Sequence, residues 1–220
     1  MKAKGILFDL DGTLVNSLPA VERCWLKFAQ RHHLDATQVL TTIHGRKAID
    51  NIKLFLPDQP ASLIEQEYHW MEQLESNDVQ GIDEIPGASD FLQLLSSMNI
   101  PWGIVTSGTK IVAEARFSLL QVAKPPVFIT GEMVANTKPA PDGYLQGAKL
   151  LGLAASSCIV FEDSAAGIES ANKANCQVIG VNTSNLINHH AQLTIDNFND
   201  LIVEKIIGSD QFIINKKTFC

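Results

Sequence analysis

Two aspartates stand one residue apart near the start of the chain, in the string FDLDGTL at residues 8–14. They follow the short apolar run Ile6–Phe8, which predicts a buried strand that ends in a Gly-Thr turn. Alternation along a strand aims Asp9 and Asp11 the same way, at the carboxyl edge of the predicted sheet. Two like charges this close are costly unless a cation lies between them, and Mg²⁺ prefers oxygen ligands. The pair therefore predicts a divalent metal site.

Two later strings offer groups that can hold an anion. IVTSG at 104–108 puts hydroxyls at the end of a buried strand, where Thr106 or Ser107 can donate to a phosphoryl oxygen or can simply cap the next helix. TKPAPDGY at 137–144 holds Lys138 beside two prolines, in a turn before a predicted helix. A lysine fixed in this way can serve as a point charge for a phosphate. The alternative is an exposed loop lysine, since most lysines in proteins lie in solvent.

A third string supplies two more carboxylates. IVFEDSAAGIESA at 159–171 ends a predicted strand with Glu162 and Asp163 and then enters a helix. Acidic side chains at the carboxyl end of a strand are good metal ligands. The alternative for Asp163 is a helix cap, since aspartate is a preferred capping residue.

The string IHGRKA at 43–48 is rich in hydrogen-bond donors, with His44, Arg46 and Lys47 around the turn residue Gly45. It lies between predicted helices, so it can contact a bound substrate if these helices close over a site. The alternative is a basic turn exposed to solvent.

The segment from residue 16 to about 84 has the periodicity of helices and contains no strong strand run. Its first string, LPAVERCWLKFAQRHH, carries apolar side chains on one face, as an amphipathic helix does. RKAIDNIKLFL and ASLIEQEYHWMEQLESN repeat this pattern, and the turn signal Pro86-Gly87 ends the segment. We therefore predict a small α-helical cap over residues 16–85.

From Pro86 onward, predicted helices and strands alternate. This alternation implies a parallel sheet with crossover helices, so we predict a doubly wound, Rossmann-like α/β core. Because the first strand precedes the helical segment, the core is expected to be discontinuous, formed by residues 1–15 and 86–220. A hairpin without a catalytic role is expected around Gly208-Ser209-Asp210. The expected helices lie at 88–98, 110–121, 141–152 and 164–175, and the expected strands lie within 100–108, 126–130, 157–163 and 176–182.

Composition excludes several classes of protein. The 220 residues carry a formal charge of −7, from 17 Lys and Arg against 24 Asp and Glu, and no basic face for nucleic acid is evident. No apolar run approaches the roughly 18 residues that a membrane span needs, so we expect no membrane association. The N-terminus enters a strand directly, and the four cysteines have neither paired nor zinc-like spacing. We expect a cytoplasmic protein with reduced thiols and no secretory signal.

Taken in order, these strings resemble the four signature motifs of the haloacid dehalogenase superfamily, whose members are mostly Mg²⁺-dependent phosphatases. The resemblance implies that Asp9 is the nucleophile and forms an aspartyl phosphate, which divides one difficult step into two easier ones. It also implies that Asp11 is the general acid/base, with its backbone carbonyl facing the metal.

The remaining motifs complete the site that the resemblance implies. Lys138 would offset charge on the nucleophile and on the transferring group, and either Thr106 or Ser107 would bind the phosphate. Asp163 would bind Mg²⁺, with Glu162 as an outer or second carboxylate on the metal. The donor-rich loop resembles the substrate-specificity loop of the family's cap, which implies a substrate role for His44 or Arg46.

Within the superfamily, the chain resembles the β-phosphoglucomutase-like branch. Dehalogenase relatives lack the second aspartate of the first motif, whereas Asp11 is present here. Mutase relatives carry a histidine in the first cap helix, where this chain has Val21. The chain looks most like bacterial sugar-phosphate and hexitol-phosphate phosphatases, although Asn16-Ser17 follows the first motif where many relatives have Asp-Ser. We expect a Mg²⁺-dependent sugar phosphatase acting on a small phosphorylated sugar or sugar alcohol; the alternatives are a phosphosugar mutase and a non-catalytic phosphate-binding regulatory protein.

Overall fold

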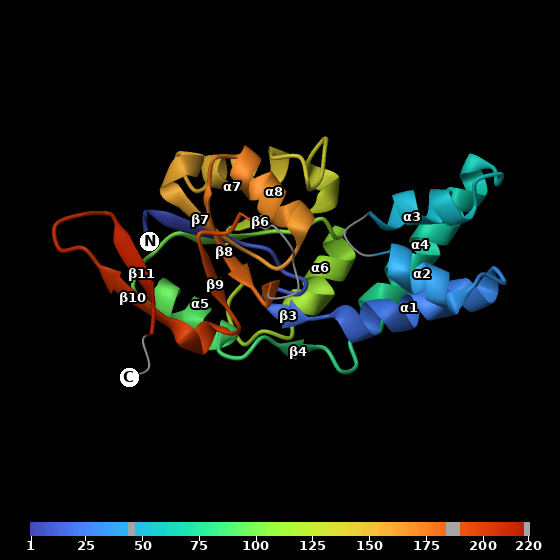
Figure 1. The fold of residues 1–220 in the computed structure, drawn as a ribbon, viewed down its shortest axis with the longest axis horizontal. Helices are drawn as coiled ribbons and strands as arrows, with labels where there is room; N and C mark the ends of the chain where they lie inside the picture. Colours follow the sequence, from blue (N-terminus) through green and yellow to red (C-terminus); the bar gives the residue numbers. More distant parts are fainter. Residues whose placement is uncertain (44–46, 184–189, 218–220) are drawn as a thin grey trace.

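A six-stranded parallel sheet forms the centre of the computed structural model, which describes residues 1–43, 47–183 and 190–217 (Figure 1). Its strand order is β6-β5-β2-β7-β8-β9, and every neighbouring pair is parallel. Because parallel neighbours cannot be joined by a tight hairpin, the connections must cross over the sheet, and helices make these crossovers. The strands are β2 (Gly5–Phe8), β5 (Trp102–Val105), β6 (Val127–Ile129), β7 (Cys158–Glu162), β8 (Gln177–Val181) and β9 (Leu193–Ile195).

Helices cover both faces of this sheet. Ile6 and Phe8 of β2 pack in one hydrophobic cluster with α5 and α6, whereas Leu7 packs in a second cluster with α7 and α8. A strand buried on both faces must be apolar throughout, which explains the uninterrupted run before Asp9. The predicted doubly wound α/β core is therefore confirmed. The crossover helices are α5 (Ala88–Ser97), α6 (Lys110–Phe117), α7 (Asp142–Leu150) and α8 (Ala165–Lys173).

Among the described residues, four helices form a separate layer at one end of the molecule, on the right in Figure 1. They enclose their own hydrophobic cluster, in which Trp25, Phe28 and Met71 are buried. The predicted small helical cap is present, inserted after the first strand of the sheet. The chain enters and leaves it through the antiparallel pair β3 (Val15–Asn16) and β4 (Asp83–Glu84). The helices are α1 (Leu18–Arg31), α2 (Ala36–Thr42), α3 (Ala48–Phe55) and α4 (Ala61–Asn77).

The first cap helix is shorter than its periodic pattern suggests. The chain leaves the helical conformation at His33, which has a φ of 55°, and a second helix then starts after Asp35. Asp35 is the N-cap of α2, since its side chain accepts a hydrogen bond from the backbone N–H of Gln38 at 2.9 Å. This cap is a local signal that divides the region into two helices.

The hairpin expected near the C-terminus is confirmed, but it does not join the central sheet. Strands β10 (Leu201–Lys205) and β11 (Phe212–Lys216) pair antiparallel, and β1 (Lys2–Ala3) pairs with β11 to complete a three-stranded sheet. Figure 1 shows this sheet at the end of the molecule opposite the cap. None of the described helices is both long and apolar enough to span a membrane. Short 3₁₀ turns lie at Gly131–Met133, Ala155–Ser157 and Phe198–Asp200.

Candidate active site

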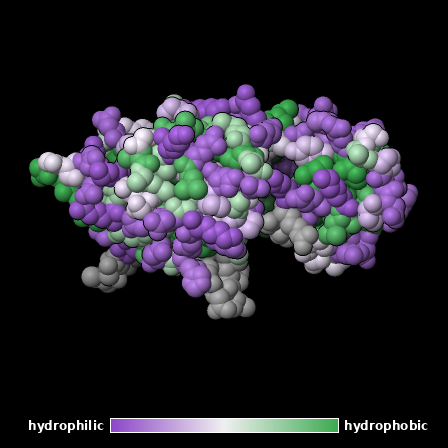
Figure 2. All heavy atoms as spheres, turned by 90° about the horizontal axis from the view of Figure 1, so that it is seen from above, coloured by the Kyte–Doolittle hydropathy of each residue, from purple (hydrophilic) through white to green (hydrophobic). Residues whose placement is uncertain are grey.

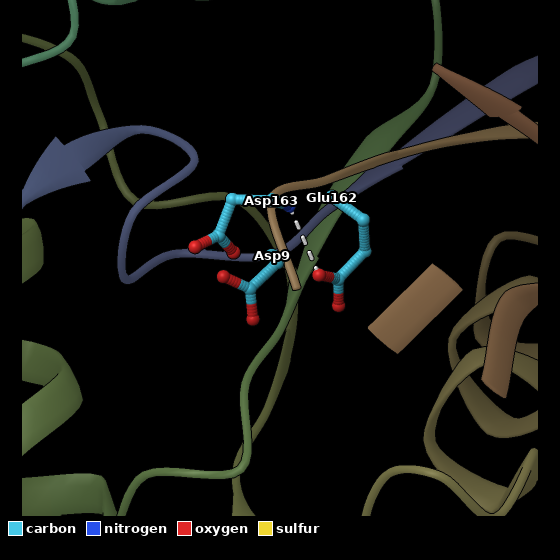
Figure 3. A group of neighbouring side chains, drawn as sticks. All are labelled: Asp9, Glu162 and Asp163. Carbon is cyan, nitrogen blue, oxygen red and sulfur yellow. Dashed lines mark hydrogen bonds between the residues drawn. The ribbon is translucent and has the colours of Figure 1, made fainter. Parts of the chain in front are cut away.

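Three carboxylates meet at the carboxyl edge of the sheet (Figure 3). Asp9 follows β2, whereas Glu162 ends the neighbouring strand β7 and Asp163 comes directly after it. Because parallel neighbours end at the same edge, residues about 150 positions apart in sequence become adjacent in space. One oxygen from each carboxylate lies within 4.8 Å of the others, which is close enough for a shared cation.

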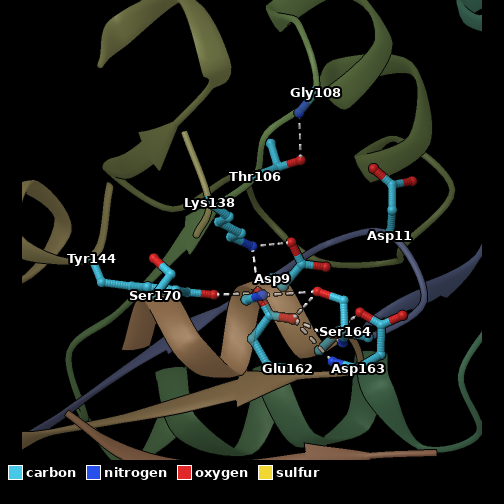
Figure 4. A network of polar contacts seen from close by, with 12 residues as sticks. Asp9, Asp11, Thr106, Gly108, Lys138, Tyr144, Glu162, Asp163, Ser164 and Ser170 are labelled. Atoms are coloured by element: carbon cyan, nitrogen blue, oxygen red, sulfur yellow. Dashed lines mark hydrogen bonds and ion pairs between the residues drawn. The ribbon is translucent and has the colours of Figure 1, made fainter. Parts of the chain in front are cut away.

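Lys138 lies between two of these carboxylates. Its ammonium group donates a hydrogen bond to Oδ1 of Asp9 and lies 2.6 Å from Oε1 of Glu162 (Figure 4). The side chain is 10% exposed, so this is not a solvated loop lysine. The ammonium also lies 5.1 Å from the centre of the Tyr144 ring, which favours a cation at this position.

Glu162 is fully buried, and both of its oxygens have protein partners. Oε1 accepts a hydrogen bond from the Tyr144 hydroxyl at 2.7 Å as well as pairing with Lys138. Oε2 accepts from the backbone N–H of Asp163 at 3.1 Å and from the backbone N–H and hydroxyl of Ser164 at 3.2 and 3.1 Å. These contacts favour a role for Glu162 in holding Lys138 in place over a role as a direct metal ligand.

The electrostatic balance of this cluster is unfavourable without a further positive charge. Burial raises the pKa of Asp9 to about 7; Lys138 opposes the rise, and the negative charge of Glu162 adds to it. Burial, followed by the charge of Asp9, also raises the pKa of Asp163 well above its ordinary value. Burial lowers the pKa of Lys138, but Asp9 and Glu162 outweigh this effect and leave it above its ordinary value. One lysine therefore does not compensate all three carboxylates.

Asp163 faces the turn that follows the first motif. The Thr13 hydroxyl donates to Oδ1 of Asp163 at 3.3 Å. Gly12 has a φ of 85°, and a Cβ atom added to it would lie 2.1 Å from Oδ2 of Asp163, so both the turn and the close approach require glycine here. Asp163 does not cap helix α8; Ser164 does so, because its hydroxyl accepts from the backbone N–H of Gly167 at 3.0 Å.

Of the two candidate hydroxyls, the contacts favour Thr106. Its Oγ1 accepts from the backbone N–H of Gly108 at 3.0 Å and lies in the loop above Lys138 (Figure 4). The residue is 4% exposed, whereas Ser107 is half-buried. Neither hydroxyl caps the following helix, because the N-cap of α6 is Thr109, which makes no side-chain capping bond. Thr106 is thus a buried hydroxyl at the site with no role in the helix.

Asp11 lies at the same cavity as Asp9 but has a different partner. Its Oδ1 accepts from Nη1 of Arg116, on α6, at 2.7 Å. The second nitrogen of the same guanidinium, Nη2, donates to Glu75 of α4 at 2.8 Å. The carboxylate of Asp11 is therefore held apart from the group of Asp9 and Asp163 (Figure 4).

A cavity of about 1170 Å³ lies over this edge of the sheet, between the core and the cap helices. In the space-filling view a hollow separates the two parts of the molecule (Figure 2). Asp9, Asp11 and Lys138 line the cavity from the core, while Val21 and Lys47 line it from the cap. The two predicted substrate residues His44 and Arg46 lie outside the described residues. The cavity is large enough to hold a small organic molecule.

The approach of helix α8 to the site depends on Gly167. A Cβ atom at this position would lie 1.7 Å from Oε1 of Glu162, so either the helix or the carboxylate must move. We expect Gly167→Ala to lower the melting temperature, because overpacking typically costs about 1–3 kcal/mol and outweighs the roughly 1 kcal/mol helix preference of alanine. Gly147→Ala in α7 is the matched control, because its nearest neighbour is the side-chain tip of Leu7 at 3.0 Å. Equal melting temperatures for the two variants would contradict the packing argument.

Three side chains that complete the site were missed by the sequence motifs. Tyr144 lies within a predicted motif string but was not singled out. Arg116 and Glu75 lie in segments that were predicted to be helices, but neither residue was singled out as part of the site. A signal for Arg116 existed, since it shares its helix face with Val112 and Phe117, both of which are buried. A charged residue on an apolar face indicates a buried partner.

Comparisons with known proteins agree with this geometry. A family model described as haloacid dehalogenase-like hydrolase matches residues 6–181. The chain is 48% identical over 182 residues to hexitol phosphatase A of Escherichia coli (strain K12), covering 83% of this chain and 84% of that protein. It is 32% identical over 197 residues to glycerol-1-phosphate phosphohydrolase 1 of Saccharomyces cerevisiae, covering 84% and 76%.

A solved structure shows the same fold along nearly the whole chain. It is a HAD hydrolase, family IA, variant 3, from Entamoeba histolytica, with a TM-score of 0.79 and 27% sequence identity. The similarity covers 90% of this chain and 95% of that one, so it includes both the sheet and the cap helices. The chain therefore belongs to the haloacid dehalogenase-like hydrolase family.

Proposed function

We propose that this protein is a Mg²⁺-dependent phosphatase that hydrolyses a small phosphorylated sugar or sugar alcohol by transferring the phosphoryl group to Asp9. The observation that carries the proposal is the buried Asp9 carboxylate, which is held by Lys138 at the edge of a cavity shared by core and cap. The relatives named hexitol phosphatase and glycerol-1-phosphate phosphohydrolase support this class of substrate.

The residues present fit a magnesium ion. Asp9 is buried and Asp163 is half-buried, both have raised pKa values, and one oxygen of each lies within 4.8 Å of the other. Hard oxygen ligands of this kind suit Mg²⁺, and we propose these two side chains and the backbone carbonyl of Asp11 as its ligands. When bound, the ion would offset the negative charge of the carboxylates and of the phosphoryl group. We also propose that Glu162, which lies 2.6 Å from the Lys138 ammonium, positions that lysine; its predicted place as an outer or second carboxylate at the metal stays a prediction.

The first half of the reaction uses Asp9 and Asp11. A carboxylate oxygen of Asp9 forms a bond to phosphorus while the bond between phosphorus and the substrate oxygen breaks. Asp11 gives a proton to the departing alkoxide, which leaves as an alcohol. Lys138 and the hydroxyl of Thr106 hold the phosphoryl oxygens, and the ammonium of Lys138 stabilises the charge that develops on them.

The second half reverses these roles. A water molecule gives its proton to Asp11 and forms a bond to phosphorus, while the bond between phosphorus and Asp9 breaks. This step yields inorganic phosphate, frees the Asp9 carboxylate and returns Asp11 to the protonated form in which it began the cycle. Asp11 is suited to serve both halves, because it borders the same cavity as Asp9 and is 25% exposed.

We propose that residues 16–85 act as a cap that selects the substrate, and that residues 1–15 and 86–220 form the catalytic core. The cap helices enclose a hydrophobic cluster of their own, which supports treating the cap as a unit. The predicted substrate residues His44 and Arg46 remain part of this proposal. Val21 lines the cavity with an apolar side chain where mutase relatives carry a histidine, so no polar group at this position orients a sugar for return of the phosphoryl group.

A substrate panel tests the proposed function. Phosphorylated hexoses, hexitols and glycerol are incubated with the protein and Mg²⁺, and released phosphate is measured. We expect stoichiometric phosphate release and no need for a bisphosphate activator. With β-glucose 1-phosphate and a trace of glucose 1,6-bisphosphate, faster accumulation of glucose 6-phosphate than of phosphate would identify a mutase instead.

Removal of divalent cations is expected to abolish phosphate release. The carboxylates of Asp9 and Asp163 would then face each other and the substrate without compensating charge. The protein is dialysed against EDTA and assayed before and after addition of Mg²⁺ or Ca²⁺. We expect Mg²⁺ to restore the rate and Ca²⁺ not to, because the larger and more flexible coordination shell of Ca²⁺ misplaces the nucleophile. Full activity in the metal-stripped protein would contradict the metal assignment.

We also propose a cytoplasmic location, which the state of the cysteines supports. Cys24, Cys158 and Cys176 are free and buried. Burial raises the pKa of Cys158 to about 11 and that of Cys176 to about 12, so both are unreactive thiols. Unpaired cysteines are usual in reducing compartments.

A further inference from the structure

Arg116 is a buried charge on the inner face of helix α6. Only 4% of the residue is exposed, and it shares its helix face with Val112, Ala113 and Phe117. Its guanidinium donates through Nη1 to Asp11 at 2.7 Å and through Nη2 to Glu75 at 2.8 Å. Within the described residues, its Nε has no hydrogen-bond partner. The two carboxylates thus hold the guanidinium by themselves.

This arrangement is an expensive way to join two helices. Removing charged groups from water costs free energy that their mutual attraction recovers only in part, and an apolar contact between α4 and α6 would serve stability as well. Burial, and to a smaller extent the charge of Asp11, raise the pKa of Glu75, and Arg116 opposes that rise. A buried ion-pair network that includes Asp11, a residue of the proposed active site, therefore indicates that the network has a role in that site.

The contact fixes one oxygen of Asp11 and leaves the other facing the site. Oδ1 is bound by Arg116, whereas no hydrogen bond to Oδ2 is present among the described residues. Oδ2 lies 3.9 Å from the position that a Cβ atom would occupy on Gly108, and Oγ1 of Thr106 lies 3.3 Å from that same position. Oδ2 is therefore directed toward the loop that carries the proposed phosphate-binding hydroxyl.

We infer that Arg116 is a positioning residue for the proton-transfer group: it anchors Oδ1 of Asp11 so that Oδ2 is presented to the leaving oxygen of the substrate. This inference rests on the proposed function, in which Asp11 gives that proton. Among the described residues, the hydrogen bonds of Arg116 go to Asp11 and Glu75 and not to Asp9 or Lys138. Arg116 also lines the cavity, and we assign its effect on proton transfer to its contact with Asp11.

Glu75 extends this anchor into the cap. It belongs to α4, which packs against α6. Its carboxylate accepts from Nη2 of Arg116, whereas Asp11 accepts from Nη1. The planar guanidinium has separate donors for two carboxylates in fixed directions, whereas the ammonium of lysine is a single point charge. The geometry therefore favours arginine over lysine, and the orientation of Asp11 depends on how α4 packs against α6.

The leaving group of the substrate provides the test. An alkyl phosphate needs a proton on its departing oxygen, whereas p-nitrophenyl phosphate releases a stable phenolate without one. First-turnover rates are measured for both substrates by rapid quench, with the best alkyl phosphate of the panel. General acid help is typically worth about 10²–10⁴-fold, so we expect Arg116→Met to lower the alkyl rate relative to the aryl rate at least about tenfold. Arg116→Lys should recover part of that loss, since it keeps a charge beside Asp11.

A double-mutant cycle tests whether Glu75 acts through Arg116. Glu75→Gln should produce a smaller change in the same rate ratio, and this change should vanish when Arg116 is already Met. Arg23→Met is the control, because Arg23 pairs with Asp78 at 2.7 Å on a more exposed surface and does not touch Asp11. It should leave the ratio unchanged.

The outcomes separate the inference from the proposed function. Equal losses on both substrates, no loss on either, or additive effects of Arg116 and Glu75 would overturn the positioning role. If Arg116→Met does not fold, Arg116→Lys and Glu75→Gln still test the positioning role. An unchanged ratio of alkyl to aryl rates in both variants would overturn it. A wild-type protein that releases phosphate from neither substrate would instead overturn the proposed phosphatase.

Discussion

Asp9→Asn is expected to reduce phosphate release from every substrate to background. The amide has nearly the same shape as the carboxylate, but it cannot form the aspartyl phosphate, so the covalent route is lost. The fold should persist, because Lys138 keeps Glu162 at 2.6 Å as a charged partner. The measurement is phosphate release at saturating substrate, together with thermal unfolding to verify that the variant is folded.

Asp90→Asn is the matched control for this substitution. Asp90 lies exposed in the first turn of α5, away from the cavity, so the same chemical change should leave the rate unaltered. Near-normal turnover in Asp9→Asn would show that another group accepts the phosphoryl group or that water attacks the substrate directly.

Asp11→Asn is expected to have the second largest effect. An asparagine can still accept the hydrogen bond from Arg116, so the side chain should stay in place while its ability to exchange a proton is lost. We expect turnover of alkyl phosphates to fall by about 10²–10⁴-fold, the usual contribution of general acid–base catalysis. Steady-state rates on a hexitol phosphate measure this loss.

The same variant should be least impaired in the first turnover of p-nitrophenyl phosphate, where the leaving group needs no proton. Phosphate binding should persist, because Lys138 and Thr106 are unchanged. A variant equally slow on both leaving groups in that first turnover would assign Asp11 to metal binding or folding instead of proton transfer.

Local patterns were sufficient to predict the fold. Helix α4 spans Ala61–Asn77, as its periodicity predicts, and the strands that carry the motifs follow from short apolar runs. The approach of Asp9 to Asp163 could also be predicted, because the carboxyl ends of adjacent parallel strands share one edge of the sheet. Short ladders such as β3 with β4 were not predicted, since a two-residue strand has no detectable periodicity.

The contacts around the site were harder to predict than its members. Arg116 and Asp11 are separated by 105 positions, and no spacing rule brings a residue of one helix to a loop after another strand. The predicted place of Glu162 as an outer or second carboxylate at the metal stays a prediction, since Glu162 lies in the carboxylate group. The sequence did not indicate that its oxygens also contact Tyr144, Lys138 and Ser164. Such assignments depend on how side chains pack, which periodicity does not encode.

The proposed covalent role of Asp9 has one direct measurement. The protein is mixed with substrate labelled on phosphorus, quenched in acid within the first turnover, digested, and the labelled peptide is sequenced by mass spectrometry. We predict a single labelled peptide that carries the phosphoryl group on Asp9, and no label in Asp9→Asn. Rapid phosphate release from substrate without any labelled peptide, or with the label on another residue, would contradict transfer to Asp9.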